Sequence, residues 1–186
     1  MSHEPIIYLD TNVIRDDTQN RRKSSVHLIA KIRNKELECY TSIFAWMEMI
    51  DGAQEEEFVR EKHKEGMEYN TICRKRNQID LSKETLEYVS EKFKDILCNY
   101  RFIKPLSLSA EGWDLALHTA SNSTISAPDT IHIATAWLSG ANLMFTSDEH
   151  LVKHCNEILE HEGVSDKLKI YKPDQAQKIL ERWKIY

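Results

Sequence analysis

The sequence has little of the residues that mark several whole classes of protein. Its 186 residues include only four cysteines, and no two of them form a C-x-x-C pair. Their wide spacing matches neither a zinc ribbon nor a disulfide framework. We therefore interpret all four as free thiols that fill small apolar gaps: Cys39, Cys73, Cys98 and Cys155.

Two further features are missing, a long apolar run and an excess of positive charge. No run approaches the roughly 20 residues of a membrane helix, and the N-terminus lacks the pattern of a signal peptide. We therefore expect a cytoplasmic protein without membrane contact. The net charge of −5 argues against a broad nucleic-acid-binding face. The basic clusters at residues 20–23 and 74–76 favour a solvated surface, although each is compact enough to hold a phosphate.

What the sequence does contain is a regular alternation of strand and helix patterns. Its length and its 41% of hydrophobic residues suit one domain with a sizeable core. Because such alternation implies parallel pairing, we predict an α/β fold, three-layer α/β/α, with a mostly parallel sheet of about five strands. The predicted strands are Ile6–Asp10, Leu37–Ser42, Phe102–Leu108, Ala141–Ser147 and Leu168–Pro173.

One region breaks the alternation. From Gln54 to about Tyr100 the chain is rich in charge and has no strand pattern. Apolar residues at helical spacing after a cap at Ser82 indicate a second helix behind a long first one. We predict a single domain over residues 1–186 that carries an inserted helical arm at about 54–100.

Four acidic residues come from distant segments of this pattern. Asp10 ends the first strand, and Asp148 follows the fourth. Glu48 lies in an apolar helical stretch after the second strand, and Asp129 opens the apolar helix before the fourth. Since a parallel α/β sheet binds ligands outside the carboxyl ends of its strands, we expect the four carboxylates to converge at one edge.

Converging carboxylates repel one another unless a cation compensates them. Mg²⁺ or Mn²⁺ prefers oxygen ligands and keeps several waters, which suits a phosphate substrate and an activated water. The sequence has no G-x-x-x-x-G-K-[ST] or G-x-G-x-x-G loop that would cradle a nucleotide.

Each acid also has a simpler interpretation as a structural residue. Asp10 suits a turn, Asp148 suits a helix cap, and Glu48 suits an ion pair with the arm. Asp129 has the spacing of a capping box with Ser126.

The segments around the four acids resemble those of PIN domains. They are YLDTNVI, TSIFAWMEMIDG and DTIHIATAWLSGANLMFTSDEHL, in this order, and the resemblance spans nearly the whole chain outside the arm. The PIN fold is that of many metal-dependent ribonucleases, including the toxins of toxin–antitoxin pairs. The resemblance implies a catalytic quartet of Asp10, Glu48, Asp129 and Asp148, with the metal on Asp10, Asp129 and Asp148, and a site shaped by Thr11, Asn12, Thr146 and Ser147.

The resemblance therefore implies an endoribonuclease that hydrolyses RNA phosphodiester bonds through a metal-activated water held by the acidic quartet. It also implies the toxin of a toxin–antitoxin pair. An alternative is a non-catalytic PIN-like module that binds RNA or protein. A small-molecule phosphatase with an aspartyl phosphate on Asp10 is a further alternative, although Asn12 replaces the second acid of that motif.

The expected partners follow from this reading. They are an RNA substrate, an antitoxin-like protein inhibitor that places an Arg or Lys among the carboxylates, and a second copy of the chain. The homodimer would use the helices of Trp46 and Trp137 or the arm, although both tryptophans also suit a core.

Two histidine patterns are weaker. His150 and His154 are one helical turn apart beside Cys155, which is the start of a zinc site without a third ligand at suitable spacing. His132 follows Asp129 on the same helix face, where it suits an interior or capping residue and also lies within reach of the acidic site.

Overall fold

The strands form one parallel sheet. The computed structural model describes residues 4–76, 78–161 and 167–183, and within them five strands pair in the order β3-β2-β1-β4-β5. Every pairing is parallel. The predicted five-stranded parallel sheet is confirmed, with each strand inside its predicted segment. The strands are β1 (Ile7–Leu9), β2 (Cys39–Ser42), β3 (Ile103–Leu106), β4 (Leu143–Phe145) and β5 (Lys169–Tyr171).

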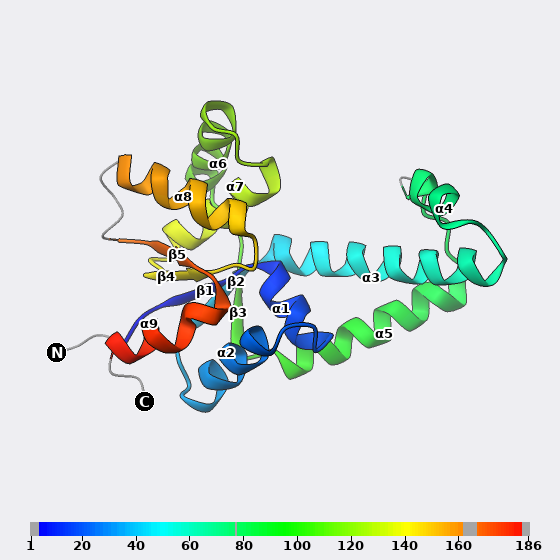
Figure 1. Ribbon diagram of the computed structural model, residues 1–186, viewed down its shortest axis with the longest axis horizontal. Helices are drawn as coiled ribbons and strands as arrows, with labels where there is room; N and C mark the ends of the chain where they lie inside the picture. Colours follow the sequence, from blue (N-terminus) through cyan, green and yellow to red (C-terminus); the bar gives the residue numbers. More distant parts are fainter. Residues whose placement is uncertain (1–3, 77, 162–166, 184–186) are drawn as a thin grey trace. The chain divides into compact units, whose positions relative to one another are not determined.

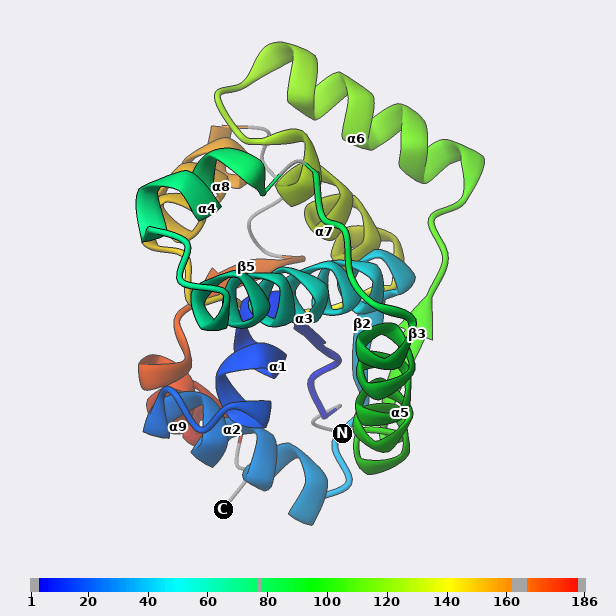
Figure 2. The ribbon, with the colours of Figure 1, turned by 90° about the vertical axis from the view of Figure 1, so that its right-hand side faces the viewer.

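Helices cover both faces of this sheet and make the three predicted layers (Figures 1 and 2). One layer holds α1 (Thr11–Thr18), α2 (Lys23–Asn34) and α9 (Ala176–Arg182), which follows the short 3₁₀ turn η1 (Pro173–Gln175). The other layer holds α6 (Ala110–Asn122), α7 (Ala127–Leu138) and α8 (Glu149–His161).

The order of the strands explains the two layers. The chain leaves β1 toward β2 through α1 and α2, whereas it enters β4, on the other side of β1, from α6 and α7. Because parallel crossovers are almost always right-handed, reversing the direction of travel moves the helices to the opposite face. From β1 the chain builds the sheet outward through β2 and β3, and from β4 it builds outward in the opposite direction to β5. The point of reversal lies between β1 and β4.

The core between the sheet and the α7–α8 layer is apolar and closely packed. Tyr8 of β1 and Met144 of β4 are both fully buried there, beside Leu151 of α8 and Ala136 of α7. Trp137 packs against the same cluster as a partly buried residue. Burial of such side chains is the main favourable term in folding this layer.

Residues 46–101 form a second compact unit, and residues 1–45 with 102–186 form the first. This unit holds most of α3 (Ile43–Lys64), together with α4 (Tyr69–Lys75) and α5 (Lys83–Asn99). The prediction of two helices here was wrong, because α4 is a third. Ser82 does cap α5, since its hydroxyl accepts a hydrogen bond from the N–H of Thr85 at 3.1 Å.

The second unit has a small core of its own. Phe58, Ile72 and Val89, one from each of its helices, are buried, and the ring of Trp46 meets that of Phe93 edge-on. No described helix is both long and apolar enough to span a membrane.

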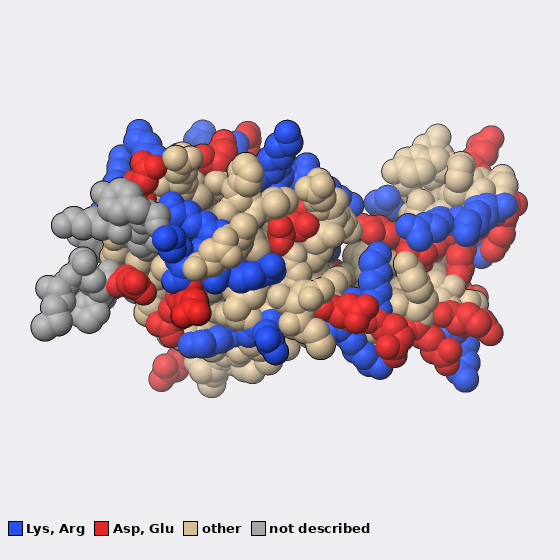
Figure 3. Space-filling model, turned by 90° about the horizontal axis from the view of Figure 1, so that it is seen from below, with Lys and Arg blue, Asp and Glu red and all other residues tan. Residues whose placement is uncertain are grey.

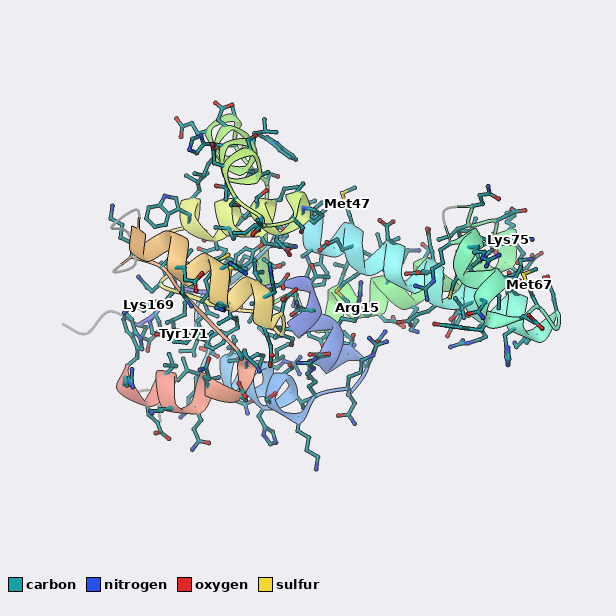
Figure 4. The ribbon with its side chains drawn as sticks, turned by 45° about the horizontal axis from the view of Figure 1, so that its top comes forward. Arg15, Met47, Met67, Lys75, Lys169 and Tyr171 are labelled. Carbon is teal, nitrogen blue, oxygen red and sulfur yellow. The ribbon has the colours of Figure 1, made fainter. Side chains whose placement is uncertain are left out.

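The open edge of the sheet at β5 is closed by a side chain. Asn156 of α8 accepts a hydrogen bond from the N–H of Ile170 at 3.1 Å and donates one to the carbonyl of Ile170 at 2.8 Å. Lys169 and Tyr171 flank Ile170 and share the other face of the strand (Figure 4). Asn156 thus takes the place of a neighbouring strand for one residue, which blunts an exposed edge.

Asn156→Asp is expected to lower the free energy of unfolding by about 1–3 kcal/mol, because a carboxylate cannot donate to the Ile170 carbonyl. Chemical denaturation of the full chain measures this loss. Lys153→Ala, an exposed change on the same helix, is the control and is expected to stay within about 0.5 kcal/mol. Equal stability of the two variants would show that Asn156 does not hold the edge.

Candidate functional site

The candidate site lies where the strand order reverses. β1 and β4 are neighbours, and the chain leaves them for opposite layers, β1 into α1 and β4 into α8. The backbone N–H of Asp10 donates to the carbonyl of Phe145 at 3.0 Å, so the ends of the two strands are level. This is the position at which an open parallel α/β sheet binds its ligands.

Asp10 is a buried carboxylate that the protein surrounds with hydrogen-bond donors. Its residue is only 4% exposed. Oδ1 accepts a hydrogen bond from the backbone N–H of Thr11 at 2.7 Å. Oδ2 accepts one from Asn12 Nδ2 and one from the Thr146 hydroxyl, each at 2.6 Å. These donors satisfy the buried group and fix the orientation of its plane.

Asn12 joins the end of β1 to the loop after β4. Its Oδ1 accepts a hydrogen bond from the backbone N–H of Ser147 at 2.7 Å, while its Nδ2 donates to Asp10 and to Thr146 Oγ1. The Thr146 hydroxyl also accepts the N–H of Asp148 at 3.1 Å. One hydrogen-bonded connection therefore runs from Asp10 to the backbone of Asp148.

His132 lies on the inner side of Asp10. It is 1% exposed, and its Nδ1 is 2.8 Å from the hydroxyl of Tyr8. The hydroxyl of Tyr8 already accepts the N–H of Ser42, so we infer that it donates its own hydrogen to Nδ1 of His132. The imidazole N–H then falls on Nε2, 3.5 Å from Asp10 Oδ1 and 3.3 Å from the Thr11 hydroxyl. His132 is thus an interior residue that also contacts the site.

Asp148 and Asp129 stand at the N-termini of two helices. Oδ1 of Asp148 accepts the N–H groups of His150 and Leu151, at 2.8 and 3.1 Å, and so caps α8. Asp129 accepts the hydroxyl of Ser126 at 2.6 Å, and Ser126 accepts the N–H of Asp129 in return. Asp148 therefore caps its helix through one oxygen, as the simpler interpretation predicted, whereas Asp129 bonds to the capping residue Ser126 and not to a backbone N–H. In these bonds each carboxylate uses one of its two oxygens.

The charges of Asp10 and Asp148 act on Asp129. Burial raises the pKa of Asp129 above its ordinary value, the Ser126 hydroxyl opposes this, and the charges of Asp10 and Asp148 raise the pKa further. His132 opposes the shift. Asp10, Asp129 and Asp148 thus form one acidic site built from the ends of β1 and β4 and the start of α7.

A comparison with family models decides what this domain is. The model of the PIN domain matches residues 7–157. The chain belongs to the PIN domain family. PIN domains are usually nucleases and are generally metal-dependent.

Other comparisons add little to the family assignment. Among solved structures, this PIN domain is similar to a chain in "Structure of FitAB bound to IR36 DNA fragment". The two chains are 14% identical with a TM-score of 0.48, and the match covers 90% of this chain and 95% of that one. A search of curated proteins gives no match.

Glu48, the fourth predicted acid, lies in α3 within the second compact unit. The three aspartates belong to the first unit. The role of Glu48 in the PIN site therefore stays a prediction from the resemblance.

The weaker histidine pattern forms no complete metal site. The rings of His150 and His154 stack with centroids 4.1 Å apart, and Cys155 is buried, which raises the pKa of its thiol to about 12. Among the described residues, no three His, Cys, Asp or Glu side chains are arranged so that they could hold a metal ion. That finding includes the three aspartates as their side chains now lie.

Sequence reasoning missed one acid of this region. Asp16 of α1 is 8% exposed and accepts hydrogen bonds on Oδ2 from the hydroxyls of Ser147 and Ser25. The available signal was its spacing from Val13, because a charged residue three positions after a core residue falls near the buried face of a helix.

The raised pKa of Asp129 predicts how stability depends on pH. Because the folded chain binds this proton more readily than the unfolded chain, stability falls as pH rises through the folded-state pKa of Asp129, above pH 3.8. Asp129→Asn removes the charge and still accepts from Ser126. We expect the variant to unfold at a higher temperature than the parent at pH 7, and the difference to vanish toward pH 3.8.

Thermal unfolding in a chelating buffer from pH 3.5 to pH 7.5 measures this difference. The exposed Asp114→Asn of α6 is the matched control. If Asp129→Asn were no more stable than the control at pH 7, the raised pKa of Asp129 would be wrong.

Proposed function

We propose that this PIN domain is a metal-dependent endoribonuclease that cuts RNA phosphodiester bonds at Asp10, Asp129 and Asp148. The observation that carries the proposal is the position of these aspartates at the reversal point of the sheet, where burial raises the pKa of Asp129 and the charges of Asp10 and Asp148 raise it further. Like charges held together in this way favour a bound cation. Membership of a family whose members are usually nucleases supports the same chemistry.

The donor set fits a hard divalent cation by charge and by ligand type, since Mg²⁺ and Mn²⁺ prefer carboxylate oxygens. Asp10 would contribute a carboxylate whose plane donors from three segments already fix. Asp129 and Asp148 would contribute the oxygen that their bonds to Ser126 and to the start of α8 do not use. When bound, the cation supplies a water of lowered pKa and offsets the charge of the phosphate.

The remaining predicted residues support this arrangement. Asn12 and Thr146 keep Asp10 in one orientation, and Ser147 positions the backbone before Asp148. Thr11 donates its backbone N–H to Asp10. Glu48 is proposed as the fourth acid of the quartet, on the strength of the family resemblance alone.

The toxin role and its partners belong to the same proposal. A site of three like charges attracts a cationic side chain when no metal is bound, so an inhibitor protein is expected to place an Arg or Lys there. A homodimer is proposed through an apolar surface. The exposed pair Trp113 and Leu117, one turn apart on α6, is a better candidate than Trp46, which is buried.

Two alternatives make different predictions. A non-catalytic PIN module would use the aspartates only at helix N-termini, where Asp148 caps α8 and Asp129 bonds to the capping residue Ser126. A phosphatase would form a covalent phosphate on Asp10, and Asn12 donates to Asp10 at the position where such enzymes carry a second acid.

Asp10→Asn is expected to reduce RNA cleavage at least about 100-fold, because it removes a charge from the proposed cation site, and changes beside a metal centre alone commonly cost 10–100-fold. Cleavage of total RNA with Mg²⁺ or Mn²⁺, followed by mapping of the ends, measures the loss. The exposed Asp114→Asn is the matched control. Thermal unfolding of both variants checks that each is folded. A folded Asp10→Asn variant that cuts as fast as the parent would refute the assignment.

Metal binding separates the enzyme from the non-catalytic module. We expect calorimetry to detect Mn²⁺ binding at millimolar concentration or below, and the Asp10→Asn variant to lose it. Absence of binding by the parent protein would favour the module. A phosphoryl adduct on Asp10 in mass spectrometry would favour the phosphatase.

A further inference from the structure

Arg22 stands beside the acidic site and is anchored there. It is the N-cap residue of α2, in the loop that follows α1. Its Nε lies 3.4 Å from Oδ2 of Asp16, and its Nη1 donates to the carbonyl of Ser147 at 3.5 Å. Since Ser147 immediately precedes Asp148, the guanidinium lies against the backbone that carries one of the three aspartates.

The anchor is a buried carboxylate. Asp16 is 8% exposed, and its Oδ2 accepts hydrogen bonds from the hydroxyl of Ser147 at 2.7 Å and from that of Ser25 at 3.2 Å. Such a group is costly to bury without partners. Three segments therefore meet at one oxygen, and the position of Arg22 is set by the buried face of α1.

Arg22 keeps donors for a ligand. A guanidinium has five N–H donors in a planar fork; Nε faces Asp16 and Nη1 donates to Ser147, so the donors of Nη2 remain for a ligand. The side chain is 53% exposed, so the outer part of the fork faces solvent. A planar fork of this kind matches the two oxygens of a phosphodiester.

Around Arg22, positive and negative side chains lie together, whereas the aspartate site holds three acids. Glu149 pairs with Lys172, which lowers the pKa of Glu149, and Arg22 lowers it further. The face in Figure 3 shows Lys and Arg interspersed with Asp and Glu. Because the chain carries a net charge of −5, an RNA strand depends on such local cations.

We propose that Arg22 binds a backbone phosphate that flanks the one cut at the aspartates, and that Asp16 positions Arg22 for this contact. The inference rests on the proposed function and adds to it a phosphate-binding residue outside the acidic site. One phosphate on Arg22 fixes where the strand lies relative to Asp148, without reading its bases. The competing explanation is that Arg22 serves only to neutralise Asp16.

The test measures binding apart from cleavage. Fluorescence anisotropy of a labelled single-stranded RNA, in EDTA and at a series of salt concentrations, gives the affinity of the full chain and its salt dependence. Arg22→Ala is expected to weaken binding roughly tenfold at low salt and to reduce the slope of log K against log salt by about 0.7. Lys23→Ala, the same loss of charge one residue along, is the matched control and is expected to change the affinity less than about twofold.

Conservative variants separate positioning from folding. Arg22→Lys keeps the charge but not the fork, so we expect it to recover only part of the affinity. Asp16→Asn weakens the anchor, and its affinity is expected to fall toward that of Arg22→Ala. Both are read at a temperature where thermal unfolding shows that they are folded. Equal losses in Arg22→Ala and Lys23→Ala would overturn the proposal, because only diffuse charge would then matter.

Steady-state cleavage distinguishes the two proposals. If the parent cuts RNA and Arg22→Ala raises KM with little change in kcat, both stand. If the parent cuts and Arg22→Ala leaves KM unchanged, the phosphate site is wrong and the nuclease remains. If the parent binds RNA through Arg22 but never cuts it, the nuclease is wrong and the phosphate site remains.

Discussion

One buried negative charge sets the conditions for the rest of this site. Asp10 has lost nearly all contact with water, so donors of the protein must replace its hydration. Those donors come from the first residues of α1 and from Thr146 after β4. The helix must therefore begin directly after β1, and β4 must be the neighbour of β1. The reversal of strand order at this place is as much a requirement of the carboxylate as a consequence of the fold.

The same arrangement holds charges that disfavour one another. Asp129 and Asp148 each serve a helix N-terminus, where the aligned backbone dipoles favour negative charge. That benefit offsets part of the cost of the acids, which for Asp129 comes first from burial and then from the charges of Asp10 and Asp148, since both raise its pKa. A protein selected for stability alone has better choices at residue 129. An acid kept at such a position is what the proposed cation site requires, in exchange for some stability.

The strands were predictable because each is a short apolar run between polar breaks, and their alternation with helices determined the parallel sheet. The aspartates were predictable because each follows a strand or opens a helix. Asp16, by contrast, depends on Ser25 and Ser147, which approach it only once α1 and α2 have packed. The bond between Tyr8 and His132 likewise joins residues 124 positions apart in sequence. The short helix α4 was missed because Ile72 is its one buried residue, too few for a period.

The place of the second unit in the chain bears on how the sheet assembles. β2 and β3 are paired neighbours in the sheet, yet the whole unit of residues 46–101 lies between them in the sequence. As an unstructured loop, this segment would add an entropic cost to strand pairing that grows slowly with its length. As a compact unit that buries Phe58, Ile72 and Val89, it brings a smaller entropic cost to that pairing than a loop of the same length. The edge strand β3 is thus coupled to a region that holds none of the three aspartates.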